Sequence, residues 1–252
     1  MPGQGRDVGV AMKRARRQFK LIITCEHGGN TIPRPYRALF IGHEALLASH
    51  RGYDLGALGC ARKLAARLDA SLYSATTSRL LADLNRTPGH PRLFSKITRG
   101  LDPAARQDIL AKYHAPHWQR VRAAVKEQLD AGQWVVHIAC HSFTPVLDGR
   151  VRDMDVGLLY DPRRAAERRF CDVWKEGLVA RAPHLRVRRN APYKGVSDGL
   201  ATHLRSLFPK HYLGVELELN QRDCIENRSR WRALCAAVIE SLAEVLAAFK
   251  SL

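Results

Sequence analysis

Two short apolar runs, far apart in the chain, each end in a histidine, and this repetition limits the folds open to the sequence. The first run, residues 21–24, has the aliphatic and β-branched side chains of a short buried strand, and Glu26, His27 and two glycines follow it. The second run, residues 134–140, is apolar almost throughout, as in a central parallel strand, and His141 follows it. In open α/β sheets, ligands bind at the carboxyl ends of the strands. We therefore expect both histidines at one edge of a sheet.

Strand-like and helix-like segments alternate along the chain, which is typical of an α/β fold. Apolar residues at helical spacing predict helices over residues 42–49, 55–68, 164–181, 229–249 and 103–129, the last split by Pro116. Further strands are predicted over residues 71–76, 156–160 and 213–219, and loops over residues 31–40 and 190–199, the second long enough to form a flap. No repeat or linker divides the sequence. We expect one domain of three α/β/α layers over residues 19–252, preceded by a flexible basic arm over residues 1–18.

Composition excludes several classes of protein. No apolar run approaches the ~20 residues of a membrane span, so no membrane association is expected. The basic N-terminal residues contain no apolar core or cleavage site and do not resemble a secretory signal. The six cysteines are scattered, with no CxxC pair, which favours reduced thiols in a cytoplasmic protein over a disulfide framework.

The formal net charge of +17 raises the question of a nucleic-acid partner. The arginines are spread along predicted helices rather than gathered in one block, and no nucleic-acid-binding signature is present. The sequence therefore disfavours nucleic acid and favours a basic surface that attracts anionic substrates. It indicates no oligomeric state.

Polar side chains at the predicted strand ends form a candidate catalytic centre. Two histidines and a carboxylate from separate elements, such as His27, His141 and Asp54, are a common set of zinc ligands. Asp54 has a structural alternative as the N-cap of the helix that follows it. Glu216 and Glu218 alternate with apolar residues, so both point to one face of their strand, and a carboxylate that does not bind metal can act as a general base.

A second polar cluster follows the predicted strand over residues 71–76. It contains Asp83, Asn85 and Arg86. An amide and a guanidinium side by side suit a substrate carboxylate, which the guanidinium binds through paired hydrogen bonds.

Several motifs together resemble the N-formylglutamate amidohydrolase family: CEHGGN, HRGYDLGA, ADLNR, HSFTPV with DVGLLYD, NAPYKG and GVELELNQ. The matching segments run in the family's order from about residue 21 to residue 221. The resemblance implies an architecture similar to zinc carboxypeptidases and aspartoacylases, with a mostly parallel central sheet. In that wider group an HxxE pair binds zinc, but here Asn30 stands at the glutamate's position. The resemblance then assigns the ligand carboxylate to Asp54, with Glu26 as the alternative.

The resemblance also implies roles for other residues. Glu218 becomes the general base, with Glu216 supporting it or binding substrate, although the two acids could be exchanged. Arg86 and Asn85 become the holders of a substrate carboxylate. Further substrate contacts are expected from Asp83, His117, Ser142, Asn190 and Tyr193.

Together these expectations describe a zinc-dependent amidohydrolase of amino-acid catabolism, with one zinc ion per chain. The substrate would be a small anionic N-acyl amino acid, N-formylglutamate being the family's example, with formate as one product. Two alternatives remain open: hydrolysis of another N-acyl amino acid or peptide amide, and a non-catalytic polyanion-binding protein on the same fold. His137, inside its predicted strand, is expected to be a hydrogen-bonded core residue.

Overall fold

The computed structural model describes residues 18–249, and the predicted arm over residues 1–18 lies outside them apart from Gln18. Within this part, a six-stranded sheet has the order β2-β1-β3-β8-β6-β7. The strands are β1 (Phe19–Cys25), β2 (Ser71–Ser74), β3 (Trp134–Phe143), β6 (Val156–Leu159), β7 (Val187–Arg189) and β8 (Tyr212–Asn220). All neighbours pair in parallel except β6 and β8, which are antiparallel. The expected mostly parallel sheet is confirmed.

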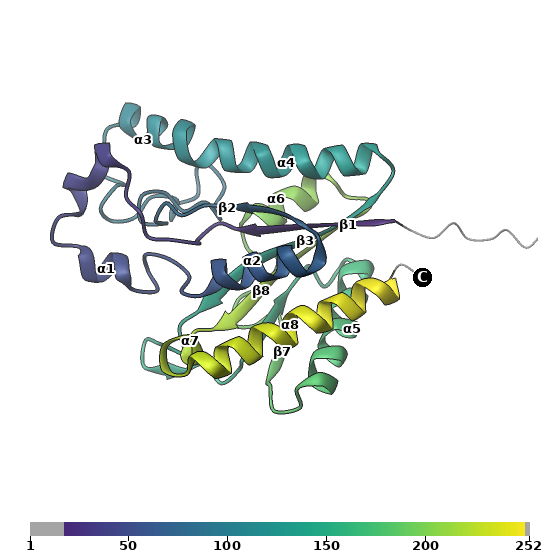
Figure 1. Ribbon diagram of the computed structural model, residues 1–252. Coiled ribbons are helices and arrows are strands. Elements are labelled where there is room, and N and C mark those ends of the chain that lie inside the picture. The colour runs from purple at the N-terminus through teal and green to yellow at the C-terminus, as the bar shows by residue number, and fades with distance from the viewer. Residues whose placement is uncertain (1–17, 250–252) are drawn as a thin grey trace, which may run out of the picture.

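Helices cover both faces of the sheet, as the three-layer prediction required (Figure 1). One face carries α2 (Ala57–Leu68), α5 (Ala165–Arg181) and α8 (Arg228–Phe249), whose apolar sides form the larger core with the strands. The other carries α4 (Ala115–Asp130) and α6 (Leu200–Leu207), which pack on the sheet through a smaller cluster. Because β3 is covered on both sides, nine of its ten residues are buried. This explains why its sequence is apolar almost throughout.

The helical segment predicted over residues 103–129 is interrupted, but not at the proline itself. It consists of α3 (Pro103–Ile109), a π-helical turn over Leu110–His114, and α4. Pro116 lies in the first turn of α4, directly after this π-helical turn. The indole of Trp118 in α4 donates a hydrogen bond of 2.7 Å to Leu84 O. This bond ties the helix to the loop that carries Asp83, Asn85 and Arg86.

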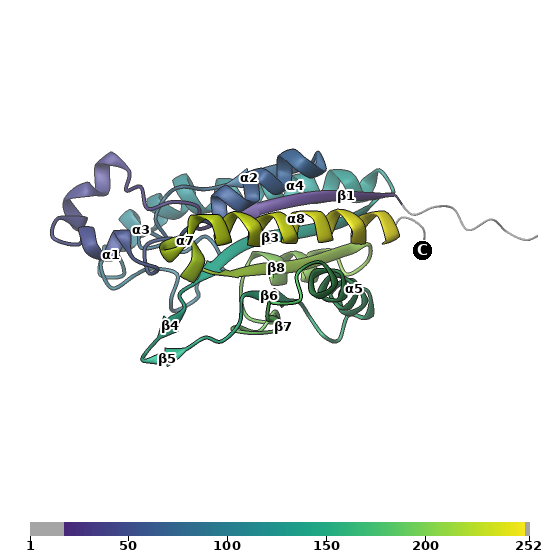
Figure 2. The ribbon, with the colours of Figure 1, turned by 60° about the horizontal axis from the view of Figure 1, so that its bottom comes forward.

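Several short elements escaped sequence analysis. They are a 3-10 helix over Arg34–Phe40 in a segment expected to be a loop, the strand β7, the helices α6 and α7 (Arg222–Glu226), and the hairpin of β4 (Val146–Leu147) and β5 (Arg150–Val151). The short helix expected over residues 42–49 is present as α1 (Glu44–Ala48). Figure 2 shows the β4–β5 hairpin projecting from the body of the molecule. Each of the missed elements has only two to eight residues and so contains few periods of any apolar pattern.

The strands β1, β3 and β8 end at the same edge of the sheet because they run in parallel. In Figure 1 this edge is on the left, where the loops after β1 and before α2 gather. β3 extends to Phe143, so His141 lies within the strand rather than after it, directly opposite Glu218 of β8. The sheet itself therefore brings one of the predicted metal ligands next to the predicted base.

In residues 18–249, no helix combines the length and the apolar character needed to cross a bilayer.

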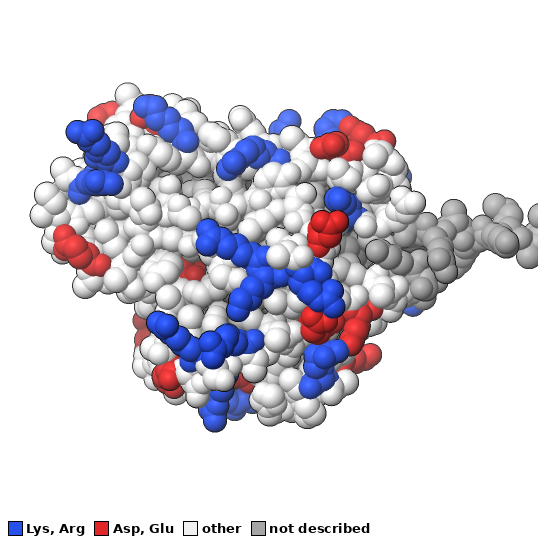
Figure 3. Space-filling view, viewed as in Figure 1, with Lys and Arg blue, Asp and Glu red and all other residues white. Residues whose placement is uncertain are grey.

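Lys and Arg gather on the face shown in Figure 3, over α2 and the start of α8, with fewer acidic side chains between them. The exposed basic side chains of these two helices are Arg62, Lys63, Arg67, Arg228, Arg230 and Arg232.

Candidate active site

His27, Asp54 and His141 meet at the carboxyl edge of the sheet. All three are buried, and each offers one ligand atom within 4.8 Å of the other two. Oxygen Oδ2 of Asp54 lies between the two rings, 3.3 Å from Nδ1 of His27 and 2.9 Å from Nδ1 of His141. The backbone amide of Asp54 donates a 2.9 Å hydrogen bond to His27 O, which brings these two residues together. The cluster can therefore hold a metal ion.

Local sequence explains how this loop closes. Gly28 lies so close to the neighbouring strand's continuation that a Cβ there would sit 2.8 Å from Ala75 O. Asp54 stands two residues before Gly56, the residue that flanks the start of α2, and its carboxylate faces the histidines. The alternative of an N-cap role for Asp54 is therefore wrong: the side chain is directed into the site instead.

The outer nitrogens of both imidazoles also face carboxylates. Nε2 of His27 lies 2.7 Å from Oδ1 of Asp83, and Nε2 of His141 lies 3.2 Å from Oε2 of Glu26. Asp83 is held in turn by Arg79, whose Nη2 is 2.6 Å from its other oxygen. Glu26 thus lies behind His141, on the opposite side of the ring from Asp54.

The electrostatics of this cluster favour a positive charge at its centre. Burial alone would lower the pKa of His141, but its contacts with Asp54 and Glu26 raise that pKa well above its usual range. Burial would raise the pKa of the Asp54 carboxyl, but the two histidines hold it below its usual range. Ionised carboxylates around two imidazoles are the environment that a divalent cation requires.

Glu218 faces this cluster from β8 and differs from the other acids. Its side chain is buried, and Oε2 accepts no hydrogen bond from the described residues. Burial is the main cause that raises its pKa to about 8; the His141 ring opposes the shift, whereas Asp54 and Glu216 add to it. Glu216 is less buried, and Oε1 accepts a 3.3 Å hydrogen bond from Nδ2 of Asn85. Of the two acids, Glu218 is therefore the one that lies buried against the cluster, directly opposite His141.

Asn85 and Arg86 are more firmly held than a pair of surface side chains. Leu200 N donates a 2.8 Å hydrogen bond to Oδ1 of Asn85, which docks the start of α6 against this loop. The guanidinium of Arg86 donates through Nη1 to the carbonyl of Asp198, while its Nε is buried and unpaired among the described residues. These bonds fix Arg86 at the wall of the site with donors left for a ligand.

A cleft of about 370 Å³ opens over these residues. Nine of the predicted site residues line it: His27, Asp54, Asn85, Arg86, His141, Ser142, Tyr193, Glu216 and Glu218. Three others do not. Asp83 lies behind His27, His117 is buried against Glu26, and Asn190 uses Oδ1 to accept hydrogen bonds from the Tyr160 and Gly195 amides. Their predicted contacts with substrate find no support in this geometry.

The sequence analysis missed ten residues that line the cleft, and five of them have basic side chains: Arg79, Arg92, His50, His90 and Lys194. Arg79 is the most important of them, because Nη1 also reaches to 3.5 Å from Oδ1 of Asp54. Asp83 and Asp54 raise the pKa of Arg79 above its usual value against the effect of burial. A lone arginine in a loop carries no sequence signal, and the only local indication is an acidic residue, Asp83, four positions later.

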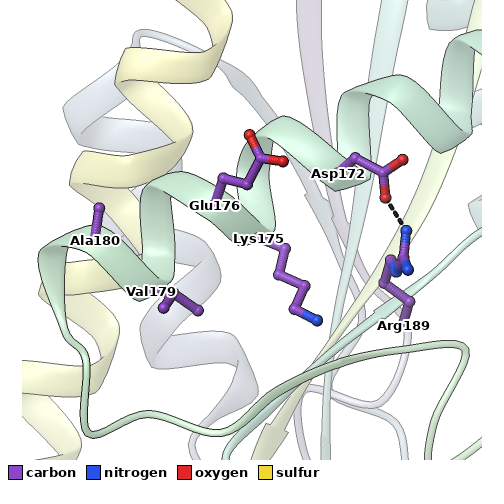
Figure 4. Close-up of a pocket in the computed structure, with 6 residues that line it drawn as sticks. All are labelled: Asp172, Lys175, Glu176, Val179, Ala180 and Arg189. Atoms are coloured by element: carbon purple, nitrogen blue, oxygen red, sulfur yellow. Dashed lines mark hydrogen bonds and ion pairs between the residues drawn. The ribbon is translucent and has the colours of Figure 1, made fainter.

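A second hollow, of about 600 Å³, lies on the surface of α5 (Figure 4). Five of its lining residues come from α5, and Arg189, at the end of β7, forms an ion pair with Asp172 across it. Its lining contains no histidine. The candidate site is therefore the cleft at the sheet edge.

The chemistry of the residues present fits a zinc ion. Two imidazole nitrogens and one carboxylate are a common protein ligand set for catalytic zinc, which leaves a fourth position open. The buried carboxylate of Glu26 adds negative charge behind His141.

Comparisons with known proteins agree with this picture. The family model of N-formylglutamate amidohydrolase matches residues 19–224. A solved structure of a gene product from Agrobacterium tumefaciens is 31% identical, with a TM-score of 0.78 over 93% of each chain. An N-formylglutamate amidohydrolase from Ralstonia eutropha shares the fold at 18% identity, with a TM-score of 0.64 over 92% of this chain and 95% of that one. None of the curated proteins matches the sequence significantly.

A metallo-carboxypeptidase from Burkholderia cenocepacia also aligns, at 15% identity and a TM-score of 0.43, over 94% of this chain and 58% of that one. The family assignment rests instead on the family model, which spans the strands β1, β2, β3 and β8 and every residue of the candidate site. The chain therefore belongs to the N-formylglutamate amidohydrolase family.

Proposed function

We propose that the protein hydrolyses the amide bond of a small N-acyl amino acid, with N-formylglutamate-type substrates foremost, and that it uses one zinc ion per chain. One observation carries the proposal: two imidazoles and a carboxylate converge within 4.8 Å, and Glu218 faces them from the adjoining strand. His27, Asp54 and His141 would hold the metal. A zinc ion supplies Lewis-acid chemistry, lowering the pKa of water and polarising a carbonyl.

The chain's own groups divide the remaining work. Glu218 accepts a proton from the attacking water and delivers it to the leaving amine, which then departs as the free amino acid. Its buried position suits this cycle, because a carboxyl with a pKa raised to about 8 can both hold and release a proton near neutral pH. Glu216 accepts a hydrogen bond from Asn85 and so helps to hold the loop that carries Asn85 and Arg86.

The cleft favours a substrate that carries negative charge. Arg79, Arg86, Arg92 and Lys194 all line it, and Nη1 of Arg79 lies 3.5 Å from Oδ1 of Asp54 in the metal cluster. The guanidinium of Arg86 suits the planar carboxylate of an amino acid. The names of the Ralstonia eutropha protein and of the family support formyl as the acyl group.

A panel of N-acyl amino acids tests this proposal. Purified protein is given N-formyl, N-acetyl and longer N-acyl derivatives of glutamate, aspartate and an apolar amino acid, with and without added zinc, and release of free amine is measured. The proposal predicts metal-dependent turnover that is fastest for the formyl derivatives of acidic amino acids. Faster turnover of the acetyl or longer derivatives would reassign the acyl group, and no turnover of any member would remove the enzymatic function.

Replacing Arg86 by Lys tests the substrate carboxylate site. Lysine keeps the charge but loses the fork that binds a carboxylate through two hydrogen bonds. Charge-assisted hydrogen bonds are worth ~1.5–3 kcal/mol, so kcat/KM for N-formyl amino acids should fall by at least ~10-fold. Zinc content and thermal stability should be unchanged.

A formamide that lacks a carboxylate provides the control for Arg86→Lys. It is expected to be a poor substrate for the wild type, and the substitution should hardly change its turnover. Equal losses on both substrates would show that Arg86 serves the loop around Asp198 rather than the substrate.

The basic face over α2 and α8 favours a second candidate function, binding of a polyanion (Figure 3). Part of this face is neutralised, since Arg67 pairs with Glu240. Retention on a phosphate resin at ~0.2 M salt, combined with no turnover on the panel, would support that function instead.

We further propose a reducing, cytoplasmic location, because none of the six cysteines forms a disulfide among the described residues.

A further inference from the structure

We propose that Glu26 is a positioning residue for the metal centre: it holds the ring proton of His141 on Nε2 and so leaves Nδ1 free to bind the metal ion. This inference rests on the metal site proposed above but involves no contact with substrate. It gives a role to a buried acid that neither lines the cleft nor joins the metal-binding cluster.

The burial of Glu26 calls for a reason. Its side chain is completely buried at the end of β1, and neither carboxylate oxygen has an aligned hydrogen bond from residues 18–249. An isolated carboxylate in such a place costs several kcal/mol. The two side chains that face it are imidazoles: Oε2 lies 3.2 Å from Nε2 of His141, and Oε1 lies 3.6 Å from Nε2 of His117. The carboxylate is thus placed between two histidines and away from solvent.

The two nitrogens of His141 face opposite partners. Nδ1 lies 2.9 Å from Oδ2 of Asp54, the same oxygen that contacts His27, so Nδ1 faces the position of the metal. Nε2 faces Glu26. A neutral imidazole carries its proton on one nitrogen and a lone pair on the other. Metal binding through Nδ1 therefore requires that the ring proton be on Nε2. The Glu26 carboxylate faces Nε2 and can accept a hydrogen bond from this N–H.

No other described group near this nitrogen can accept that proton. Nδ2 of Asn85 lies 3.5 Å from Nε2, but it is an amide donor. The orientation of this amide is fixed, because its Oδ1 accepts from Leu200 N and its Nδ2 donates to Glu216. Asn85 cannot replace Glu26 as the acceptor.

The other histidine of the cluster has the same arrangement. Nε2 of His27 faces Asp83 at 2.7 Å while its Nδ1 faces Asp54. Histidines that bind metals commonly donate their second N–H to a carboxylate, and the loss of such a partner typically weakens metal binding 10–100-fold. Asp83 is anchored by Arg79, whereas within residues 18–249 the only side chain besides His141 that contacts the Glu26 carboxylate as an ion-pair partner is the buried His117.

The test compares Glu26→Leu and Glu26→Gln with the wild type, using zinc alone as the probe. The zinc dissociation constant is measured by competition with a chelator of known affinity. We expect Glu26→Leu to bind zinc ~10–100-fold more weakly, and Glu26→Gln to fall between, because a glutamine oxygen can still accept the proton. The matched control is Glu218→Gln, another buried acid beside His141, whose zinc affinity should stay near that of the wild type.

Two further readouts separate positioning from a structural role. The metal-free Leu variant should melt at a lower temperature than the wild type, because removing one partner of a buried ion pair is destabilising, and its zinc affinity is therefore measured well below that temperature. The ¹⁵N spectrum of the zinc-loaded wild type should show Nδ1 of His141 bound to the metal and a hydrogen-bonded proton on Nε2, and this hydrogen bond should be lost in the Leu variant but kept in weaker form in the Gln variant. The Leu variant keeps the test valid if the Gln variant fails to fold.

Unchanged zinc affinity in both Glu26 variants, with normal zinc binding by the wild type, would overturn the role of Glu26 and leave the proposed function intact. Wild-type protein that binds no zinc would overturn both. Wild-type protein that binds zinc but hydrolyses no N-acyl amino acid would remove the proposed function, while the difference in affinity would still support Glu26.

Discussion

Glu218→Gln is expected to lose most of the hydrolytic rate while keeping the fold and the metal site. The substitution preserves the shape of the side chain but removes its ability to take and give a proton, and general acid–base catalysis typically contributes ~10²–10⁴-fold. Glu218 is buried opposite His141, and Oε2 has no hydrogen-bond partner among the described residues. No described group forms a hydrogen bond to this oxygen through which it could transfer the proton in place of Glu218. kcat should therefore fall by this factor, with KM little changed.

The control is Glu216→Gln, on the same face of the same strand. Glu216 accepts a hydrogen bond from Asn85, which a glutamine oxygen can also accept, so its loss should be mild. Steady-state kinetics on one formyl amino acid, with zinc content measured for both variants, separates the two acids. A severe loss in Glu216→Gln and a mild one in Glu218→Gln would exchange their roles.

Asp54→Asn should have the second large effect, on metal binding and through it on turnover. Oxygen Oδ2 of Asp54 contacts both imidazoles, and no other carboxylate joins the cluster that can hold a metal within the described residues. Because a ligand contributes more than an outer partner, zinc affinity should fall by more than ~100-fold. Activity should be lost at low zinc and return in part when zinc is added in excess.

Asp83→Asn is the matched comparison, since Asp83 touches His27 from the outer side only. Its zinc affinity should fall less, by ~10–100-fold. Zinc titrations of the two variants, followed by competition with a chelator, give the order of effects. A larger loss of zinc affinity in Asp83→Asn than in Asp54→Asn would show that Asp54 is not the carboxylate that binds the metal.

Sequence patterns predicted the parts of the fold that depend on long apolar runs. β1, β3 and β8 are buried on both faces, and their apolar residues therefore identify them without knowledge of neighbours. The same logic placed His27 and His141 together, because parallel strands end at one edge. It also predicted that Glu216 and Glu218 share a face, since side chains alternate along a strand.

Other features depend on contacts between distant segments. Nothing local in the sequence distinguishes an Asp54 that caps α2 from one that faces two histidines, because the choice depends on where β3 places His141. His137 does occupy the core as expected, but its partners Thr24 and Tyr212, at 2.8 and 2.6 Å, come from two other strands. Likewise, the role of Arg79 follows from its approach to Asp54 and Asp83, which the tertiary fold alone creates.

The central claim is that one metal ion, held by His27, Asp54 and His141, is required for amide hydrolysis. Its most direct test is to add zinc stepwise to metal-free protein while following the release of amine from an N-formyl amino acid. The account predicts no turnover without metal, a linear rise with added zinc, and saturation at one zinc ion per chain. Full turnover by protein shown to be free of metal, or saturation with zinc without any turnover, would contradict it.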